Sequence, residues 1–229
     1  MSTHDTDSPA NDRPANEGLA NEGLANGGLA NDELAPGARS FLILHGWQNH
    51  RPPGHWQHWL AGRLAELGQH VVYPQLPDPD DPDLEVWLAE LARHLDALRG
   101  PERVVLAHSL SAVLWLHAVA RGLPGAAAVD RVLLVAPPSA SVLADLPEIT
   151  GFTLEEGDFT VPASTRLVAG DDDPYCPEGA GAVYGDPLGV RTQVLAGAGH
   201  LGMDAGYGPW PSVLEWCLDG AAPITVRAS

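Results

Sequence analysis

The sequence of 229 residues lacks an apolar run of the roughly 20 residues that a membrane-spanning helix needs. Its first residues, MSTHDTDSPAND, have neither a basic start nor an apolar core, so no secretory signal is expected. Cysteine is also scarce, because Cys176 and Cys217 stand far apart and form no C-x-x-C motif. A disulfide framework is therefore not expected. We expect a reduced, cytoplasmic setting instead.

Positively charged residues are also few. Twelve Lys and Arg stand against 30 Asp and Glu, which gives a formal net charge of −18 at pH 7. Such a chain is repelled by phosphate backbones and by anionic lipids, so neither nucleic acid nor a membrane is expected as a partner. The hydrophobic content of 45% is ordinary for a globular protein. We expect a small-molecule partner, and a monomer is the default expectation because the sequence is silent on oligomeric state.

The first part of the chain differs in composition and repetitiveness from the rest. Residues 15–35 repeat a five-residue unit of the type A-N-x-G-L, which is too short per unit for a solenoid. Its regular Asn and Gly disfavour a stable helix. We therefore expect residues 1–38 to be a disordered acidic tail, 39–220 to be the folded domain and 221–229 to be a C-terminal tail.

Within the folded domain, short apolar runs alternate with stretches of helical spacing. Strands are expected at 41–44, 70–73, 103–107, 131–136, 165–169 and 191–195. Helices are expected at 55–67, 84–98, 110–121 and 210–218, and a small cap or long loop at 139–163. This alternation predicts an α/β fold, a mostly parallel sheet with helices on both faces. Ligands of such sheets bind beyond the carboxyl ends of the strands.

One strand end has the layout of a nucleophile elbow. Residues 104–113 read VVLAHSLSAV, an apolar run that stops at Ser109 and continues with a small-residue helical pattern. The usual pattern is G-x-S-x-G, and here Ala107 and Ser111 replace both glycines. Ser111 adds a side chain where the strand and the helix pack closely, so a distorted and inactive elbow remains an alternative.

Two other strand ends carry the groups that a reactive serine needs. Asp171-Asp172-Asp173 follows the strand at 165–169, and His200 follows the strand at 191–195. The order Ser…Asp…His along the chain is that of α/β-hydrolases. In such a triad an imidazole accepts the proton of the serine, and a buried carboxylate holds the imidazole.

The chain resembles the α/β-hydrolase family of small serine hydrolases that includes retinoblastoma-binding protein 9 and its bacterial relatives. The segments that carry the resemblance are HGW at 45–47, GHWQHW at 54–59, AHSLS at 107–111, VAPP at 135–138, DDPY at 172–175, GH at 199–200 and GYGPWP at 206–211. The resemblance implies an α/β-hydrolase domain with Ser109 as nucleophile, Asp173 as acid and His200 as base. Asp172 is the alternative acid. The oxyanion hole is expected to use the backbone N–H groups of Leu110 and, after the first strand, Trp47.

Other histidines and tryptophans permit further interpretations. His55 and His58 are spaced H-x-x-H, but no second ligand set of comparable clarity exists, so no metal site is expected. Trp47 is the best candidate for a substrate pocket because it follows a strand beside the expected site. We expect the tryptophans at helical spacing, Trp56, Trp59 and Trp87, to be core residues.

These features predict a serine hydrolase that cleaves a small ester, thioester or amide through an acyl-enzyme, without a cofactor. Two alternatives stay open. The altered elbow and the repeat-bearing tail would also suit a non-catalytic α/β-hydrolase-like binding protein. An acyltransferase would use the same triad and differ from a hydrolase only in the access of water.

Overall fold

The computed structural model of the chain describes residues 37–154, 159–162 and 164–227. The expected acidic tail therefore lies outside the described residues, apart from Gly37 and Ala38. Six strands alternate with helices through the described part of the chain. In chain order the elements are β1 (Ser40–Leu44), α1 (Trp56–Glu66), β2 (His70–Val72), α2 (Leu84–Ala97), β3 (Arg103–His108), α3 (Leu110–Ala120), β4 (Arg131–Val135), α4 (Ala140–Asp145), β5 (Thr165–Gly170), α5 (Asp186–Leu188), β6 (Arg191–Leu195) and α6 (Pro211–Leu218).

The strands form one parallel sheet in the order β2-β1-β3-β4-β5-β6. Strand β3 lies near its middle, with Ala107 opposite Leu44 of β1 and His108 opposite Val135 of β4. The strand order reverses direction at β1, and ligand sites of open α/β sheets form beyond the carboxyl ends of the strands at such a point.

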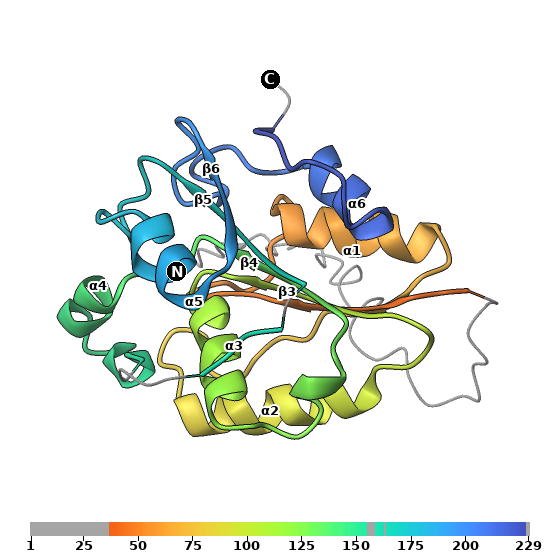
Figure 1. Cartoon of the computed structure of the whole chain (residues 1–229), viewed down its shortest axis with the longest axis horizontal. Coiled ribbons are helices and arrows are strands. Elements are labelled where there is room, and N and C mark those ends of the chain that lie inside the picture. Colours follow the sequence, from red (N-terminus) through yellow and green to blue (C-terminus); the bar gives the residue numbers. More distant parts are fainter. Residues whose placement is uncertain (1–36, 155–158, 163, 228–229) are drawn as a thin grey trace, which may run out of the picture. The chain divides into compact units, whose positions relative to one another are not determined.

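Helices cover both faces of the sheet, with α1 and α6 on one side and α2 and α3 on the other (Figure 1). Side chains alternate between the two faces along each strand, so Phe41 and Ile43 pack with the α1 and α6 layer. Leu42 and Leu44 pack with the α2 and α3 layer. The four inner strands β1, β3, β4 and β5 are buried on both faces, which explains their apolar runs, whereas the edge strands β2 and β6 are partly exposed.

The structure confirms the α/β fold expected from the sequence. All six expected strands and all four expected helices are present, with ends within one residue of the expected ones. The expected cap contains α4 and a 3-10 turn at Thr150–Phe152. This turn is anchored to the helical layer below it, because the ring of Phe152 packs edge-on against Trp87 at 5.4 Å.

The sequence did not predict the helical turns between β5 and β6. A π-helical turn at Gly181–Gly185 continues into α5. Four glycines between 179 and 189 remove the apolar periodicity that would reveal a helix. A long-range contact holds the segment instead, since the hydroxyl of buried Tyr184 donates a hydrogen bond to the carbonyl of Pro138.

Residues 221–227, expected as part of a tail, pack against the sheet edge and the loop after β6. Ile224 is fully buried, and its N–H donates to the side-chain oxygen of Gln193 in β6. The carbonyl of Thr225 accepts a hydrogen bond from Trp210 Nε1 at 2.7 Å. The chain after α6 thus covers part of the α1 and α6 layer.

Candidate active site

Ser109 occupies a strained turn between β3 and α3. Its φ of 58° and ψ of −126° lie in a region that L-residues rarely adopt, as expected for a nucleophile elbow. The turn is fixed from the neighbouring strand, because the N–H of Ser109 donates to the carbonyl of Val135 at 2.8 Å. Leu110 is the first residue of α3, so its N–H has no carbonyl partner four residues back within the helix.

The loop after β1 approaches this serine closely at Gly46. A Cβ atom on Gly46 would lie 2.6 Å from Ser109 Cβ and 3.1 Å from Ser109 Oγ, so only glycine fits. His45 fixes the following peptide, because its Nδ1–H donates to the Gly46 carbonyl at 2.8 Å. In a trans peptide the Trp47 N–H points opposite to that carbonyl. Burial lowers the pKa of His45 to about 4, which keeps its ring neutral.

The structure brings the three expected triad residues together. His200 Nε2 lies 2.9 Å from Ser109 Oγ, and His200 Nδ1 lies 2.9 Å from both carboxylate oxygens of Asp173. A carboxylate only accepts, so Nδ1 carries the proton and Nε2 is left to accept from the serine hydroxyl. The Asp173 side chain is 1% exposed and that of His200 is 19% exposed. The carboxylate is thus buried behind an imidazole that solvent reaches.

The three consecutive aspartates have three different partners. Asp171 accepts from the N–H of Gly197 at 2.7 Å, and Asp172 accepts from the N–H of Gly199 at 2.6 Å. Only Asp173 contacts the His200 ring. Asp171 and Asp172 therefore tie the loop after β6 to the loop after β5. This geometry favours Asp173 over Asp172 as the acid.

Two aromatic rings pack around the imidazole of His200. The ring of Tyr175 lies 4.4 Å from it and that of His108 lies 5.3 Å from it. The N–H of Tyr175 also donates to Asp173 Oδ1 at 2.9 Å. His108 Nε2 contacts the His200 carbonyl at 3.0 Å. Complete burial, followed by the repulsion that His200 and His55 would exert when they are also protonated, lowers the pKa of His108 well below its usual value, so this neighbour stays uncharged.

A family model described as "Serine hydrolase" matches residues 41–217, which is most of the chain. The chain belongs to the serine hydrolase family. The match runs from β1 into α6 and includes Ser109, Asp173 and His200. No curated protein sequence matches the chain.

Solved structures share the fold of this serine hydrolase. The ydeN gene product from B. subtilis is 24% identical, with a TM-score of 0.65 over 79% of this chain and 97% of that one. A putative yden-like hydrolase from Pectobacterium atrosepticum is 21% identical, with a TM-score of 0.62 over 78% of this chain and 88% of that one. A thioesterase domain from the curacin biosynthetic pathway is 18% identical, with a TM-score of 0.51 over 80% and 92%.

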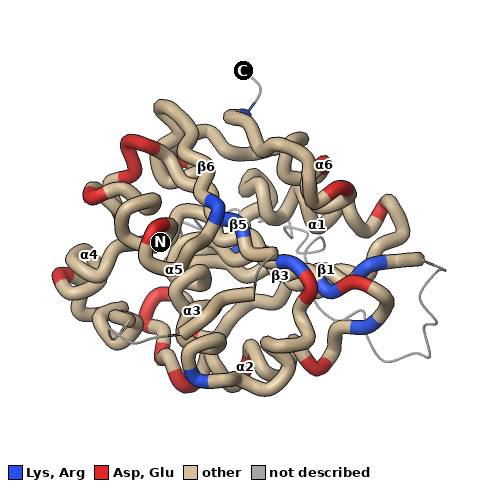
Figure 2. The backbone as a smooth tube through the Cα atoms, viewed as in Figure 1, with Lys and Arg blue, Asp and Glu red and all other residues tan. Residues whose placement is uncertain are grey.

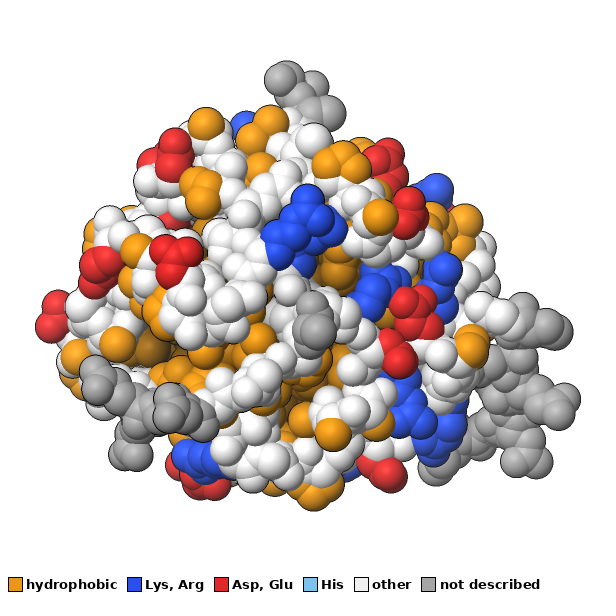
Figure 3. Space-filling view, viewed as in Figure 1, with side chains coloured by type: hydrophobic (Ala, Val, Ile, Leu, Met, Phe, Trp, Pro, Cys, Tyr) orange, Lys and Arg blue, Asp and Glu red, His pale blue; other side chains and the backbone are white. Residues whose placement is uncertain are grey.

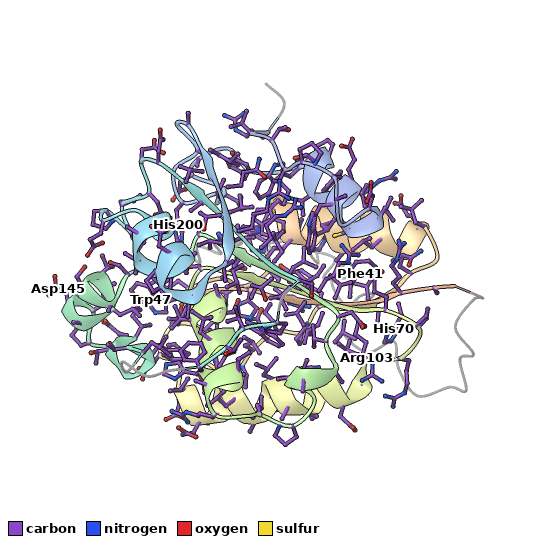
Figure 4. The ribbon with its side chains drawn as sticks, viewed as in Figure 1. Phe41, Trp47, His70, Arg103, Asp145 and His200 are labelled. Atoms are coloured by element: carbon purple, nitrogen blue, oxygen red, sulfur yellow. The ribbon has the colours of Figure 1, made fainter. Side chains whose placement is uncertain are left out.

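A pocket of about 720 Å³ opens beside His200 in this serine hydrolase. Trp47, the expected pocket residue, lines it together with His55, Tyr175 and Met203. Figure 4 shows Trp47 and His200 toward the same end of the molecule, with Phe41, His70 and Arg103 toward the other. The site therefore lies at the carboxyl ends of the strands, as the sequence predicts.

His55 and the tryptophans at helical spacing have capping or packing roles. No group of three or more His, Cys, Asp or Glu side chains among the described residues could hold a metal ion. His55 caps α1, since its Nδ1 accepts from the N–H of Gln57 at 3.2 Å. Trp56 and Trp87 are fully buried, and Trp59 packs partly buried against the same core as Trp56.

Sequence reasoning missed the roles of Tyr175 and Met203 in the site and the loop-bridging role of Asp172. Tyr175 follows the Asp173 loop directly, so an aromatic residue two positions after the acid was the available signal. The loop-bridging role of Asp172 depends on Gly199, which is distant in sequence. Met203 lies in a stretch without a recognisable pattern, and its place in the pocket has no signal in the sequence.

Proposed function

We propose that this serine hydrolase cleaves a small ester, thioester or amide through an acyl-enzyme formed on Ser109. The observation that carries the proposal is the continuous hydrogen-bonded chain from Ser109 Oγ through His200 to buried Asp173, with both links at 2.9 Å. A serine that is strained into the elbow, bonded to an imidazole and backed by a carboxylate is arranged for nucleophilic attack.

In the proposed reaction, Ser109 Oγ attacks the acyl carbon while His200 Nε2 takes the hydroxyl proton. His200 then returns that proton to the leaving alcohol, thiol or amine, and the acyl group stays on Ser109. A water molecule repeats the sequence and releases the acid. The N–H groups of Leu110 and Trp47 would stabilise the oxyanion, and Asp173 would stabilise the imidazolium.

Several finer points of the proposal come from the sequence. The expected partner is a small-molecule acyl substrate, and the pocket beside His200 is large enough for one. We propose that the protein acts in the cytoplasm as a monomer. None of the described helices is both long and apolar enough to cross a membrane. The proposed chemistry needs no cofactor.

The test is covalent labelling with a fluorophosphonate, followed by turnover of 4-nitrophenyl acetate, butyrate and octanoate and of an acyl thioester. Ser109 is expected to carry the label, and Ser109→Ala is expected to lower kcat by about 10⁴-fold or more because the nucleophile and base act as a unit. The matched control is Ser139→Ala, which removes a different buried serine hydroxyl.

Two results would count against this function. Turnover that survives in Ser109→Ala, or a wild-type protein that neither labels nor turns over any acyl substrate, contradicts the acyl-enzyme. The second result favours the binding-protein alternative. Product analysis in the presence of an added alcohol or amine separates hydrolysis from acyl transfer, since a transferase gives the new ester or amide rather than the free acid.

A further inference from the structure

Ser111, which replaces the second elbow glycine, makes a dense set of hydrogen bonds. It is fully buried in the first turn of α3. Its Oγ accepts from the N–H of His108 at 3.0 Å and lies 2.8 Å from the carbonyl of Leu44 and 3.0 Å from that of His108. A hydroxyl has one proton to donate, and the shorter distance favours Leu44 as its acceptor. The hydroxyl therefore joins the elbow to β1.

The bond to Leu44 forms where β1 ends and the chain passes into the loop that approaches Ser109. Leu44 is the last residue of β1 and lies opposite Ala107 of β3. Its carbonyl also accepts from the side-chain amide of Gln57, at 2.7 Å, so the strand end is held from both helical layers. The chain then passes directly into His45-Gly46-Trp47, the loop that touches Ser109.

Ser111 thus connects the two segments that carry the expected oxyanion donors. Leu110 precedes it in α3, and Trp47 follows the strand end that it bonds. Two donors stabilise an oxyanion only if their spacing is fixed before the reaction. A glycine at this position would leave the Leu44 carbonyl and the His108 N–H without this link between the two segments.

Resting on the proposed function, we infer that Ser111 is a positioning residue that fixes the loop after β1 against the elbow and so sets the spacing of the oxyanion donors. The replacement of the glycine does not distort the elbow into inactivity. Instead it adds a bond between the two halves of the site, while Ser111 itself stays buried and does not touch the substrate.

The test compares Ser111→Ala, Ser111→Gly and Ser111→Cys with the wild type. The last variant nearly keeps the volume and replaces a strong donor by a weak one. Stoichiometric fluorophosphonate labelling gives the number of reactive sites, so kcat is expressed per site. Binding of a trifluoromethyl ketone, which forms a tetrahedral adduct on the serine, reports on the oxyanion hole separately from substrate binding.

We expect kcat per site to fall about 10-fold in Ser111→Ala with KM changed less than twofold, and ketone affinity to fall by a similar factor. Ser111→Gly and Ser111→Cys are expected to behave alike. The control is Ser212→Ala, because buried Ser212 also bridges two backbone groups, the N–H and the carbonyl of Thr225, at 3.0 and 3.1 Å. That variant is expected to lose stability and keep its kcat.

Unchanged kcat per site and unchanged ketone affinity in Ser111→Ala, with only a lower melting temperature, would overturn the inference while leaving the proposed function intact. A rise in KM alone would do the same. A wild-type protein without Ser109-dependent turnover would overturn both, so the two failures are distinguishable.

Discussion

The two ends of the sheet differ in backbone strain. Six non-glycine residues in the described part of the chain have positive φ, and each follows the carboxyl end of a strand: Gln48, Arg51, Asp78, Ser109, Ala136 and Leu201. Such conformations are unfavourable and persist where the surrounding structure fixes them, often at functional sites. The strained residues therefore lie at the end of the sheet where Ser109, Asp173 and His200 meet.

The amino ends of the strands carry arginines in place of strained residues. Figure 2 marks basic positions along the backbone near the labels of β1, β3, β5 and β6, some with acidic positions next to them, and Figure 3 shows basic and acidic side chains on the same face. Arg131 in β4 binds Glu102 and the carbonyls of Trp216 and Cys217 at the end of α6, and its guanidinium lies 4.8 Å from the Trp216 ring centre. Arg166 in β5 binds the carbonyls of Gly220 and Ala222.

This difference indicates that the carboxyl and amino ends of the sheet have different roles. At the carboxyl end, hydrogen bonds hold Ser109, His200 and Asp173 together in a strained turn and its neighbouring loops. At the amino end, guanidinium groups satisfy carbonyls that α6 and the following chain leave open. Substitutions at the first end should change the rate more than the stability, and substitutions at the second should do the reverse.

The largest expected effect separates two neighbouring aspartates at the carboxyl end. Asp173→Asn should lower kcat by about 10⁴-fold, because an amide can donate to His200 Nδ1 and so favours the wrong tautomer. Asp172→Asn should keep kcat within about threefold, because its amide oxygen can still accept from the Gly199 N–H. Steady-state kinetics on a 4-nitrophenyl ester measures both.

Equal losses in the two variants would show that the loop bridge, rather than the contact with His200, governs the rate. The reverse order would assign the acid to Asp172. Urea unfolding of both proteins checks that each is folded to a similar extent, so that the difference in kcat reports on the imidazole.

The second effect concerns the contact of Gly46 with Ser109. Gly46→Ala should lower kcat by about 10²-fold or more, because the new methyl group displaces the serine or the oxyanion loop. Gly62→Ala is the control, since Gly62 lies in α1 with nothing within 4 Å of the added methyl. The control should stabilise the protein by about 0.5–1 kcal/mol. Full activity in Gly46→Ala would contradict the close approach.

The sequence predicts the fold here much better than it predicts the details of the site. Alternation of apolar strands and amphipathic helices is a local signal, and β6 and α3 follow it almost to the residue. Ser109, Asp173 and His200 could be proposed because each follows a strand. The bond of Ser111 to Leu44, by contrast, spans 67 residues, and no local pattern encodes it. The same holds for the contact of Gly46 with Ser109.

The third effect tests the amino end. Arg131→Met keeps most of the apolar stem and removes the guanidinium, so the free energy of unfolding should fall by about 2–3 kcal/mol while kcat stays unchanged. Arg93→Met is the control, because Arg93 is largely exposed and pairs with Glu90 and His94, its neighbours on α2. Its effect should stay within about 0.5 kcal/mol. A loss of kcat in folded Arg131→Met would break the division between the two ends.

The smallest effect concerns the stability of the carboxyl end against acid. Burial, followed by the repulsion that His45 and His200 would exert when they are also protonated, lowers the pKa of His55 to about 4. Burial likewise lowers the pKa of His45 to about 4. Since the unfolded value is about 6.5, the unfolded chain binds more protons as the pH falls. The stability is therefore fully present above pH 6.5 and is lost progressively as the pH falls toward 4.

At pH 5.5 each of these two groups should account for a loss of about 1 kcal/mol relative to pH 7.5, measured by urea unfolding. His55→Asn removes the contribution of His55 to this loss of unfolding free energy and keeps the helix cap. Asparagine is also a good helix N-cap and can accept from the Gln57 N–H. The fall between the two pH values should be about 1 kcal/mol smaller in this variant than in the wild type. An equal fall would mean that His55 carries its proton in the folded state, and the buried histidines of the carboxyl end would then not weaken the fold in acid.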